Sequence, residues 1–151
     1  MIDKSFKVLT YVLLVIAFTV EVRSQADCVL GVGITDNETL VTVFQMNEMQ
    51  QENLTNFEAE LKYRNEILNN QLKNITERHP QSTPTELAQL ASKYKAVMDS
   101  MQVIQTFTDK KLLRLFNEKQ YELYLSLCKE ASRSPYIVEP KVYNDSIPSK
   151  D

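Results

Sequence analysis

The sequence predicts an all-α protein with a long antiparallel helical hairpin, a C-terminal helix, a short N-terminal helix and an extended tail. Two observations lead to this prediction. Only two glycines and five prolines occur in 151 residues, so long stretches carry no helix breaker. Apolar residues also recur at helical spacing in three stretches, which begin near Asn47, Pro84 and Asn117.

The first long helix is expected from Asn47 to about Arg78. His79-Pro80 should end it, because the residue before a proline is pushed out of the helical region. Its apolar residues are spaced by threes and fours or their sum, which places them on one face. They are Leu54, Phe57, Leu61, Leu68, Leu72 and Ile75.

The second long helix should begin at Thr83-Pro84-Thr85-Glu86, which combines an N-cap hydroxyl, a proline at the first helical position and a glutamate three residues after the cap. A near-heptad series of side chains follows: Leu87, Leu90, Tyr94, Val97, Met101, Ile104 and Thr108. The short connection between the two helices predicts an antiparallel pair, each helix roughly 45 Å long.

The remaining elements are shorter. A last helix is expected from Asn117 to Ala131, and a short one from Glu38 to Phe44, capped by Asp36 or Asn37. The last helix should face the others with Tyr121, Tyr124, Leu127, Cys128 and Ala131. Three prolines in residues 135–151 predict an irregular C-terminal tail, within which residues 136–138 could lie against the helices.

Residues 1–26 have the layout of a secretory signal peptide. Lys4 and Lys7 precede an apolar run that ends at Val20, and the small residues of Ser24-Gln25-Ala26 follow. The run is shorter than the ~20 apolar residues of a membrane-spanning helix. We therefore expect a periplasmic or secreted protein whose mature form does not span a membrane, with residues 27–134 as its single helical domain. An uncleaved N-terminal anchor is the alternative.

The cysteines, Cys28 and Cys128, both lie beyond the signal. Thiols of an exported protein meet an oxidising compartment, so a structural disulfide is expected. It would close a loop of about 100 residues, worth ~4.7 kcal/mol in the chain-entropy estimate. The alternative, reactive or metal-binding thiols, lacks the close spacing of a CxxC or zinc motif.

Two short segments share one pattern: an apolar residue, Asn, Glu, any residue, then Gln. They begin at Met46 and Phe116, each at an expected helix start. The Asn side chain can cap amides of the first turn, and Gln at the third helical position can reach back to the cap residue's own N–H. Two well-capped helices are the simplest interpretation.

This pair of motifs, far apart in a short exported helical chain, resembles the LTxxQ repeats of the Spy/CpxP family of periplasmic proteins. Asn47 and Asn117 stand in place of threonine, Met46 and Phe116 in place of leucine, and Gln50 and Gln120 match the pattern. The resemblance covers about residues 47–131. It implies a thin, curved, all-helical dimer that binds unfolded clients or reports envelope stress, with metal-responsive relatives.

Enzymatic function finds little support. The one histidine, His79, stands at a helix end, where interaction with the helix dipole explains it. No nucleophile elbow and no HExxH motif occurs, and two glycines are too few for a phosphate-cradling loop. A net charge of −3 does not favour nucleic acid. We therefore expect no catalytic residues, no cofactor, no metal site and no nucleic-acid partner.

Methionine and tyrosine side chains allow two interpretations. Met98 and Met101 continue the apolar stripe and are expected to fill the core, although methionines also form metal sites or adaptable binding surfaces. Tyr94 and Tyr124 are expected to pack between helices, although tyrosines can also line a client-binding face. The expected partners are unfolded or envelope proteins, or one folded partner of the cell envelope. A homodimer is expected if the long helices expose an apolar side.

Overall fold

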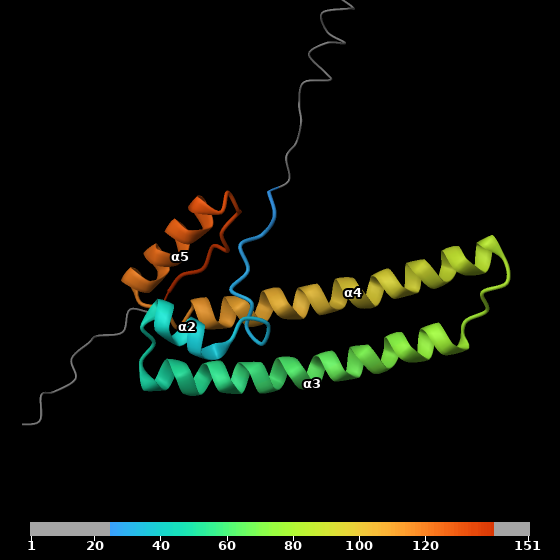
Figure 1. Cartoon of the computed structure of the whole chain (residues 1–151), viewed down its shortest axis with the longest axis horizontal. Helices are drawn as coiled ribbons and strands as arrows, with labels where there is room; N and C mark the ends of the chain where they lie inside the picture. The colour runs from blue at the N-terminus through green and yellow to red at the C-terminus, as the bar shows by residue number, and fades with distance from the viewer. Residues whose placement is uncertain (1–24, 141–151) are drawn as a thin grey trace, which may run out of the picture.

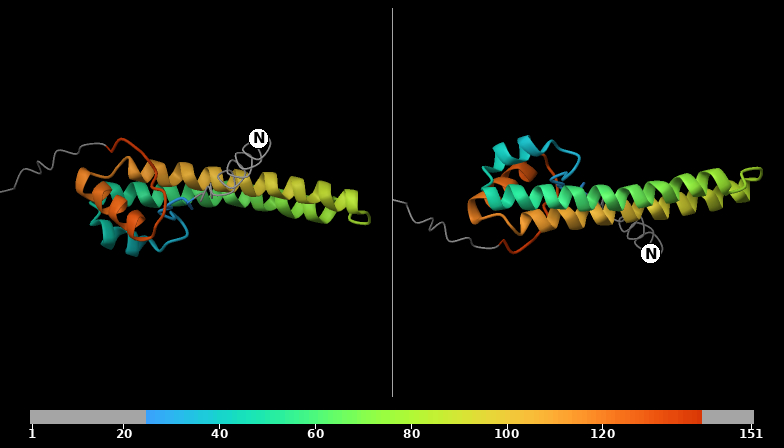
Figure 2. Two further views of the ribbon diagram at one scale, coloured as in Figure 1. Left: turned by 90° about the horizontal axis from the view of Figure 1, so that it is seen from above. Right: turned by 90° about the horizontal axis from the view of Figure 1, so that it is seen from below.

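The computed structural model describes residues 25–140, and four helices lie in this range. The long helices α3 (Glu48–Arg78) and α4 (Pro84–Leu113) run antiparallel, side by side (Figure 1). The shorter helices α2 (Asn37–Phe44) and α5 (Glu118–Glu130) lie at the end of the hairpin where α3 begins and α4 ends, as the views from above and below also show (Figure 2). The all-α fold and the hairpin with its C-terminal helix are confirmed.

Two of the predictions fall largely outside the described range. The signal peptide covers residues 1–26, of which only the last two are described, and residues 141–151 of the expected tail are not described. The described part of that tail packs on the helices, because Tyr136 is buried.

The helix starts follow from the capping residues. Glu86 N–H donates to Thr83 Oγ1 at 3.2 Å, and Thr83 N–H donates to Glu86 Oε2 at 3.0 Å, which completes the capping box expected for α4. Asp36 caps α2 by accepting the N–H of Thr39 at 3.0 Å. His79 is the C-cap of α3, as its position before a proline predicts.

The hydrophobic core lies at one end of the molecule, which we call the base. It combines side chains of α2, α5, the first turns of α3 and the last turns of α4. Residues 28–32, before α2, and Tyr136, after α5, complete it. Its larger buried members are Leu40, Phe44, Met46, Leu54, Leu112, Leu113, Phe116, Tyr124 and Tyr136. The rest of the hairpin, residues 62–104, projects from the base and is called the arm.

The arm has almost no core of its own, because Val97 is the one residue buried within it. The predicted packing of Tyr94 and Met98 is wrong, since each is 43% exposed, and Leu87 is 48% exposed. The reason is geometric: two paired helices each cover one stripe of the other. On the adjoining face of α4, residues 27–34 approach only the part beside Met98 and Met101 and leave a hollow there. Leu127 of α5, expected to face the other helices, is 39% exposed.

Candidate functional site

The described residues, 25–140, contain no group of three His, Cys, Asp or Glu side chains placed to hold a metal ion. Three features of the described residues are candidates for a functional role: the paired motifs of the base, the segment that the disulfide fixes, and the uncovered surfaces of the hairpin.

Both motifs form capping boxes. Asn47 Oδ1 accepts the N–H of Gln50 at 2.9 Å, and Asn47 N–H donates to Gln50 Oε1 at 3.0 Å. The second motif repeats this arrangement, with Asn117 Oδ1 accepting from Gln120 N–H and Asn117 N–H donating to Gln120 Oε1, both at 2.9 Å. The apolar residue that opens each motif, Met46 or Phe116, is buried.

The two glutamines also bind each other. Gln50 Nε2 donates to Gln120 Oε1 at 2.9 Å, and Gln120 Nε2 donates to Gln50 Oε1 at 3.0 Å. The second N–H of each amide reaches the end of a helix: Gln50 donates to the carbonyl of Leu115, just after α4, and Gln120 donates to that of Phe44, the last residue of α2. Each buried amide thus makes four hydrogen bonds and satisfies every donor and acceptor it has.

The sequence predicts each glutamine as part of the cap of its own helix and does not predict this contact. The sequence does contain a signal for it, which is the identical spacing of the two motifs. A glutamine that closes a capping box uses only its oxygen there, so both of its amide hydrogens remain free to bind another segment. In the folded chain those hydrogens join the starts of α3 and α5 in the buried base.

The disulfide forms between Cys28 and Cys128, as expected, with Cα atoms 5.6 Å apart. It fixes residues 25–35, which we call the strap, to α5. The strap is also bridged to the C-terminal segment, because Cys28 N–H donates to the carbonyl of Ser134 at 2.8 Å and Ser134 N–H donates to that of Ala26 at 3.0 Å. The strap is therefore held to α5 by the disulfide and to the C-terminal segment by two backbone hydrogen bonds.

Asp109 of α4 holds the middle of the strap. Its Oδ2 accepts the N–H groups of Leu30 at 2.9 Å and Gly31 at 3.2 Å, and its Oδ1 accepts that of Val32 at 3.1 Å and Gln105 Nε2 at 3.0 Å. Asp109 is fully buried, and this burial raises the pKa of its carboxyl group although the hydrogen bonds oppose the shift. Gly31 allows the turn because its φ is +76°.

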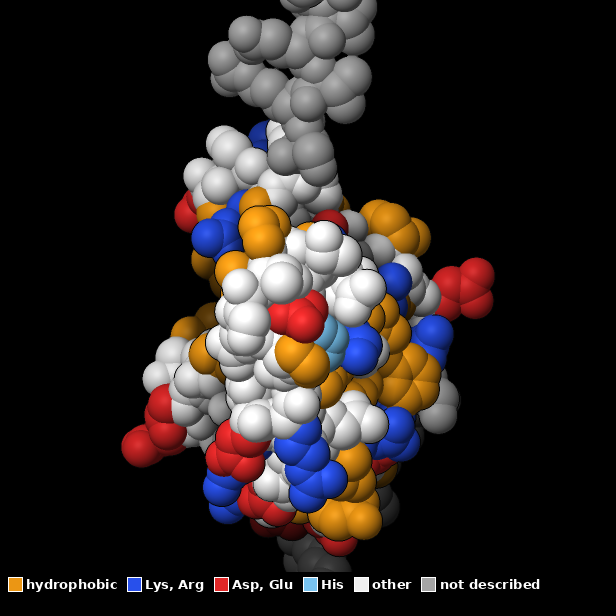
Figure 3. All heavy atoms as spheres, turned by 90° about the vertical axis from the view of Figure 1, so that its right-hand side faces the viewer, with side chains coloured by type: hydrophobic (Ala, Val, Ile, Leu, Met, Phe, Trp, Pro, Cys, Tyr) orange, Lys and Arg blue, Asp and Glu red, His pale blue; other side chains and the backbone are white. Residues whose placement is uncertain are grey.

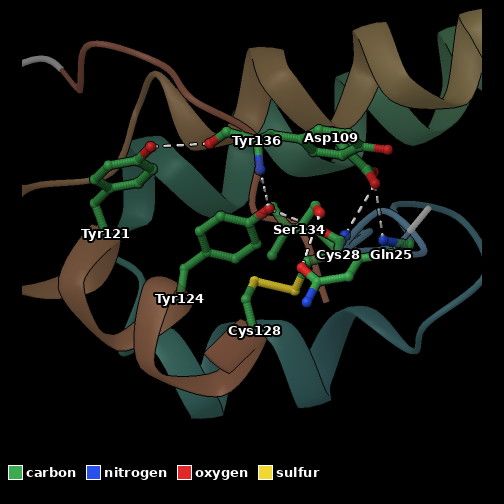
Figure 4. The surroundings of a disulfide bond; sticks show 10 residues. Gln25, Cys28, Asp109, Tyr121, Tyr124, Cys128, Ser134 and Tyr136 are labelled. Atoms are coloured by element: carbon green, nitrogen blue, oxygen red, sulfur yellow. Dashed lines mark hydrogen bonds between the residues drawn. A yellow bond between two sulfur atoms is a disulfide. The ribbon is translucent and has the colours of Figure 1, made fainter. Parts of the chain in front are cut away.

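Tyrosine hydroxyls complete the contacts around the disulfide (Figure 4). Tyr124 donates to the carbonyl of Cys28 at 2.7 Å and accepts the N–H of Tyr136 at 2.8 Å, so it joins the strap to the C-terminal segment. Burial raises the pKa of Tyr124 to about 12. Tyr121 donates to the carbonyl of Tyr136 at 2.9 Å. Tyr124, which sequence reasoning placed in the packing, is confirmed there.

One uncovered apolar face runs along the arm. Leu87, Tyr94 and Met98 are seven and four residues apart, a spacing that places them on one side of α4. Met98 also lines a hollow of about 380 Å³, together with Met101 and, from the strap, Val29 and Ile34. We call Leu87, Tyr94, Met98 and this hollow the arm face.

A second uncovered patch lies on another side of α4. Val103 and Phe107 are exposed and line a hollow of about 420 Å³ with Thr106 and Lys110. Beside Phe107, the Lys111 Nζ lies 5.0 Å from its ring centroid and forms an ion pair with Glu60 of α3 at 2.6 Å. The hydrogen bond from Lys111 lowers the pKa of the Glu60 carboxyl group, with help from Arg64.

Comparison of the chain with protein-family models, curated proteins and solved structures found no match. Among residues 25–140, no helix is both long and apolar enough to cross a membrane.

Proposed function

We propose that this chain is an exported, non-catalytic binding protein of the Spy/CpxP type, periplasmic or secreted, that acts as a chaperone for unfolded proteins or as an envelope-stress or metal-responsive sensor. The observation that carries the proposal is the arm face. It exposes Leu87, Tyr94 and Met98 to solvent on a projecting two-helix arm, which the disulfide-tied base holds in place.

The composition of the arm face suits weak and adaptable binding. Methionine side chains are flexible and polarisable, and they recur on surfaces that bind many partners. Tyrosine offers a large apolar ring with a polar tip, so it tolerates water when no client is bound. Polar side chains such as Asn65 and Gln102 adjoin the hollow, which limits the contiguous apolar area and favours release of a client.

The base supports this role by keeping its own glutamine amides satisfied. The Gln50–Gln120 pair satisfies the side-chain amides of both glutamines, so these residues hold helices together and the arm is left to bind. Dimerisation through the arm is part of the proposal, because a second copy would cover the exposed side chains. Light scattering at high protein concentration measures it, and a monomeric mass would count against it.

The second candidate is a docking module for one folded partner of the envelope. The patch at Val103 and Phe107 favours it, because cation–π contacts and the Lys111–Glu60 ion pair give that surface a defined shape. A fixed patch selects one native surface, whereas the arm face suits several non-native chains.

The breadth of binding separates the two functions. Two unrelated, chemically unfolded clients are diluted into buffer with and without the protein, and aggregation is followed by light scattering. The chaperone function predicts suppression for both clients at near-stoichiometric ratios. If neither client is protected, the docking function becomes the better account, and pull-down of a native envelope protein tests it.

A further inference from the structure

A basic hollow lies at the tip of the arm, at the opposite end of the hairpin from the base. It has a volume of about 380 Å³, within the range of small-ligand sites. The lining combines cationic, apolar and amide groups: Asn74, Ile75, Arg78, His79, Pro80 and Lys93. In Figure 3, which faces this end of the molecule, the histidine adjoins basic, hydrophobic and acidic side chains.

The cationic groups of the hollow have no carboxylate partner. Neither Arg78 nor Lys93 forms an ion pair with any described residue. The carboxylates near Arg78 and Lys93 in sequence have other partners. Glu77 lies 3.9 Å from Lys73, and Asp99 lies 2.6 Å from Lys95. Glu86 accepts the N–H groups of Ser82 and Thr83 at 2.9 and 3.0 Å. No acidic side chain lines the hollow.

Helix dipoles do not account for the whole group. Arg78 in the last turn of α3 complements the negative end of that helix. Lys93 has no such role, because it lies more than two turns inside α4. The His79 ring is oriented by a contact of 2.8 Å between its Nδ1 and the carbonyl of Pro80, so its Nε2 is the nitrogen left for another partner.

We propose that this hollow binds the carboxylate of an apolar organic acid, such as the C-terminal residue of a peptide or a fatty acid. The guanidinium of Arg78 and the ammonium of Lys93 match the carboxylate, and Arg78 can bind it through two parallel hydrogen bonds. Ile75 and Pro80 provide the apolar surface for the attached chain. The site is independent of the proposed client binding, because it shares no residue with the arm face.

The imidazole of His79 gives a direct measurement, because it is the only histidine of the chain. Its proton NMR signals are followed while the protein is titrated with N-acetyl-leucine, octanoate, N-acetyl-leucinamide or acetate. We expect saturable shifts with N-acetyl-leucine, octanoate or both, with a Kd on the order of 1 mM. A response to the first alone indicates a peptide terminus as the source, and a response to octanoate alone indicates a fatty acid.

Matched variants test the assigned residues. Arg78→Gln with Lys93→Gln is expected to raise the Kd roughly tenfold or more, because two charge-assisted contacts are lost. Lys62→Gln with Lys119→Gln changes net charge equally at exposed sites outside the hollow and should leave the Kd unchanged. Equal shifts with the acid and its amide, equal affinity for acetate, or equal losses in both variants would overturn the proposal.

Discussion

Gln50 and Gln120 lie 70 residues apart in the chain, and each donates its side-chain amide to the carbonyl oxygen of the other. Each also closes the capping box of its own helix and binds a carbonyl at the end of another helix. The starts of α3 and α5 and the ends of α2 and α4 thus meet at one pair of amides. This pair gives the two matching sequence motifs a shared structural role.

Replacing one member of the pair should destabilise the base strongly. We expect Gln50→Ala or Gln120→Ala to lower the free energy of unfolding by about 3 kcal/mol, because each leaves buried donors and acceptors unpaired. In a double-mutant cycle the combined loss should fall short of the sum by about 1 kcal/mol or more. Urea unfolding followed by circular dichroism measures all three losses. Strict additivity would show that the amide pair carries no coupling.

Gln51 provides the control for that cycle. It neighbours Gln50 and is exposed, and its amide donates to the carbonyl of Met46 at 2.8 Å without meeting the partner motif. Gln51→Ala should cost no more than about 0.5 kcal/mol.

The carboxyl group of Asp109, which accepts the N–H groups of the strap, should make the free energy of unfolding depend on pH in a defined direction. Its pKa is raised in the folded protein, whereas the unfolded value is about 3.9, so between the two values the folded chain holds a proton that the unfolded chain has lost. The contribution of Asp109 to stability therefore falls as pH rises through this window. The groups around it are Gln105, the strap N–H groups and the hydroxyls of Tyr124 and Tyr136.

Asp109→Asn tests this sign. The variant should be about 2 kcal/mol less stable at pH 4, because its amide NH2 faces strap N–H groups that need an acceptor. Its deficit relative to the natural protein should shrink as pH is raised toward 7. Denaturant unfolding of both proteins at a series of pH values measures the difference. A deficit that grows with pH would mean that the four hydrogen bonds outweigh burial and lower the pKa.

The disulfide is expected to be the largest single contribution to stability. Because Cys28 and Cys128 are 100 residues apart, the loop-closure estimate for the double replacement by alanine is a loss of about 4.7 kcal/mol. Guanidinium unfolding of both proteins measures it. Alkylation of the unreduced, denatured protein is the prior check, since modification of two thiols would show that the bond does not form.

The arm should open more readily than the base. Val97 is its one buried residue, whereas the base holds the core, the disulfide and the glutamine pair. We expect amide hydrogens of residues 62–104 to exchange at least tenfold faster than those of α5, through local opening of the arm. Native-state hydrogen exchange with mass spectrometry measures this. Equal protection of the arm and α5 would contradict the division into two parts.

Local signals in the sequence predicted the helices well. Asn47, Thr83 and Asn117 cap α3, α4 and α5 as expected, and His79-Pro80 ends α3, because these effects act within one turn of the chain. The motif residues were also found, although only as caps.

Contacts between distant segments were not predictable in the same way. The strap could not be placed on α4, because nothing in the sequence around Asp109 marks it as the acceptor of three distant N–H groups. The exposure of Tyr94 and Met98 was not predicted either, because here the sequence implies a contact that the described residues do not make. Their periodicity requires an apolar neighbour, but it does not say whether that neighbour belongs to the same chain.

Suppression of client aggregation by two matched variants tests the central claim most directly. One variant carries Leu87→Gln, Tyr94→Gln and Met98→Gln on the arm face, and the other carries Val103→Gln and Phe107→Gln on the second patch. Both sets are exposed, so both variants should fold. The account predicts that the first loses most of the suppression and the second keeps it. Full suppression by the first variant, or an equal loss in both, would contradict the assignment of client binding to the arm face.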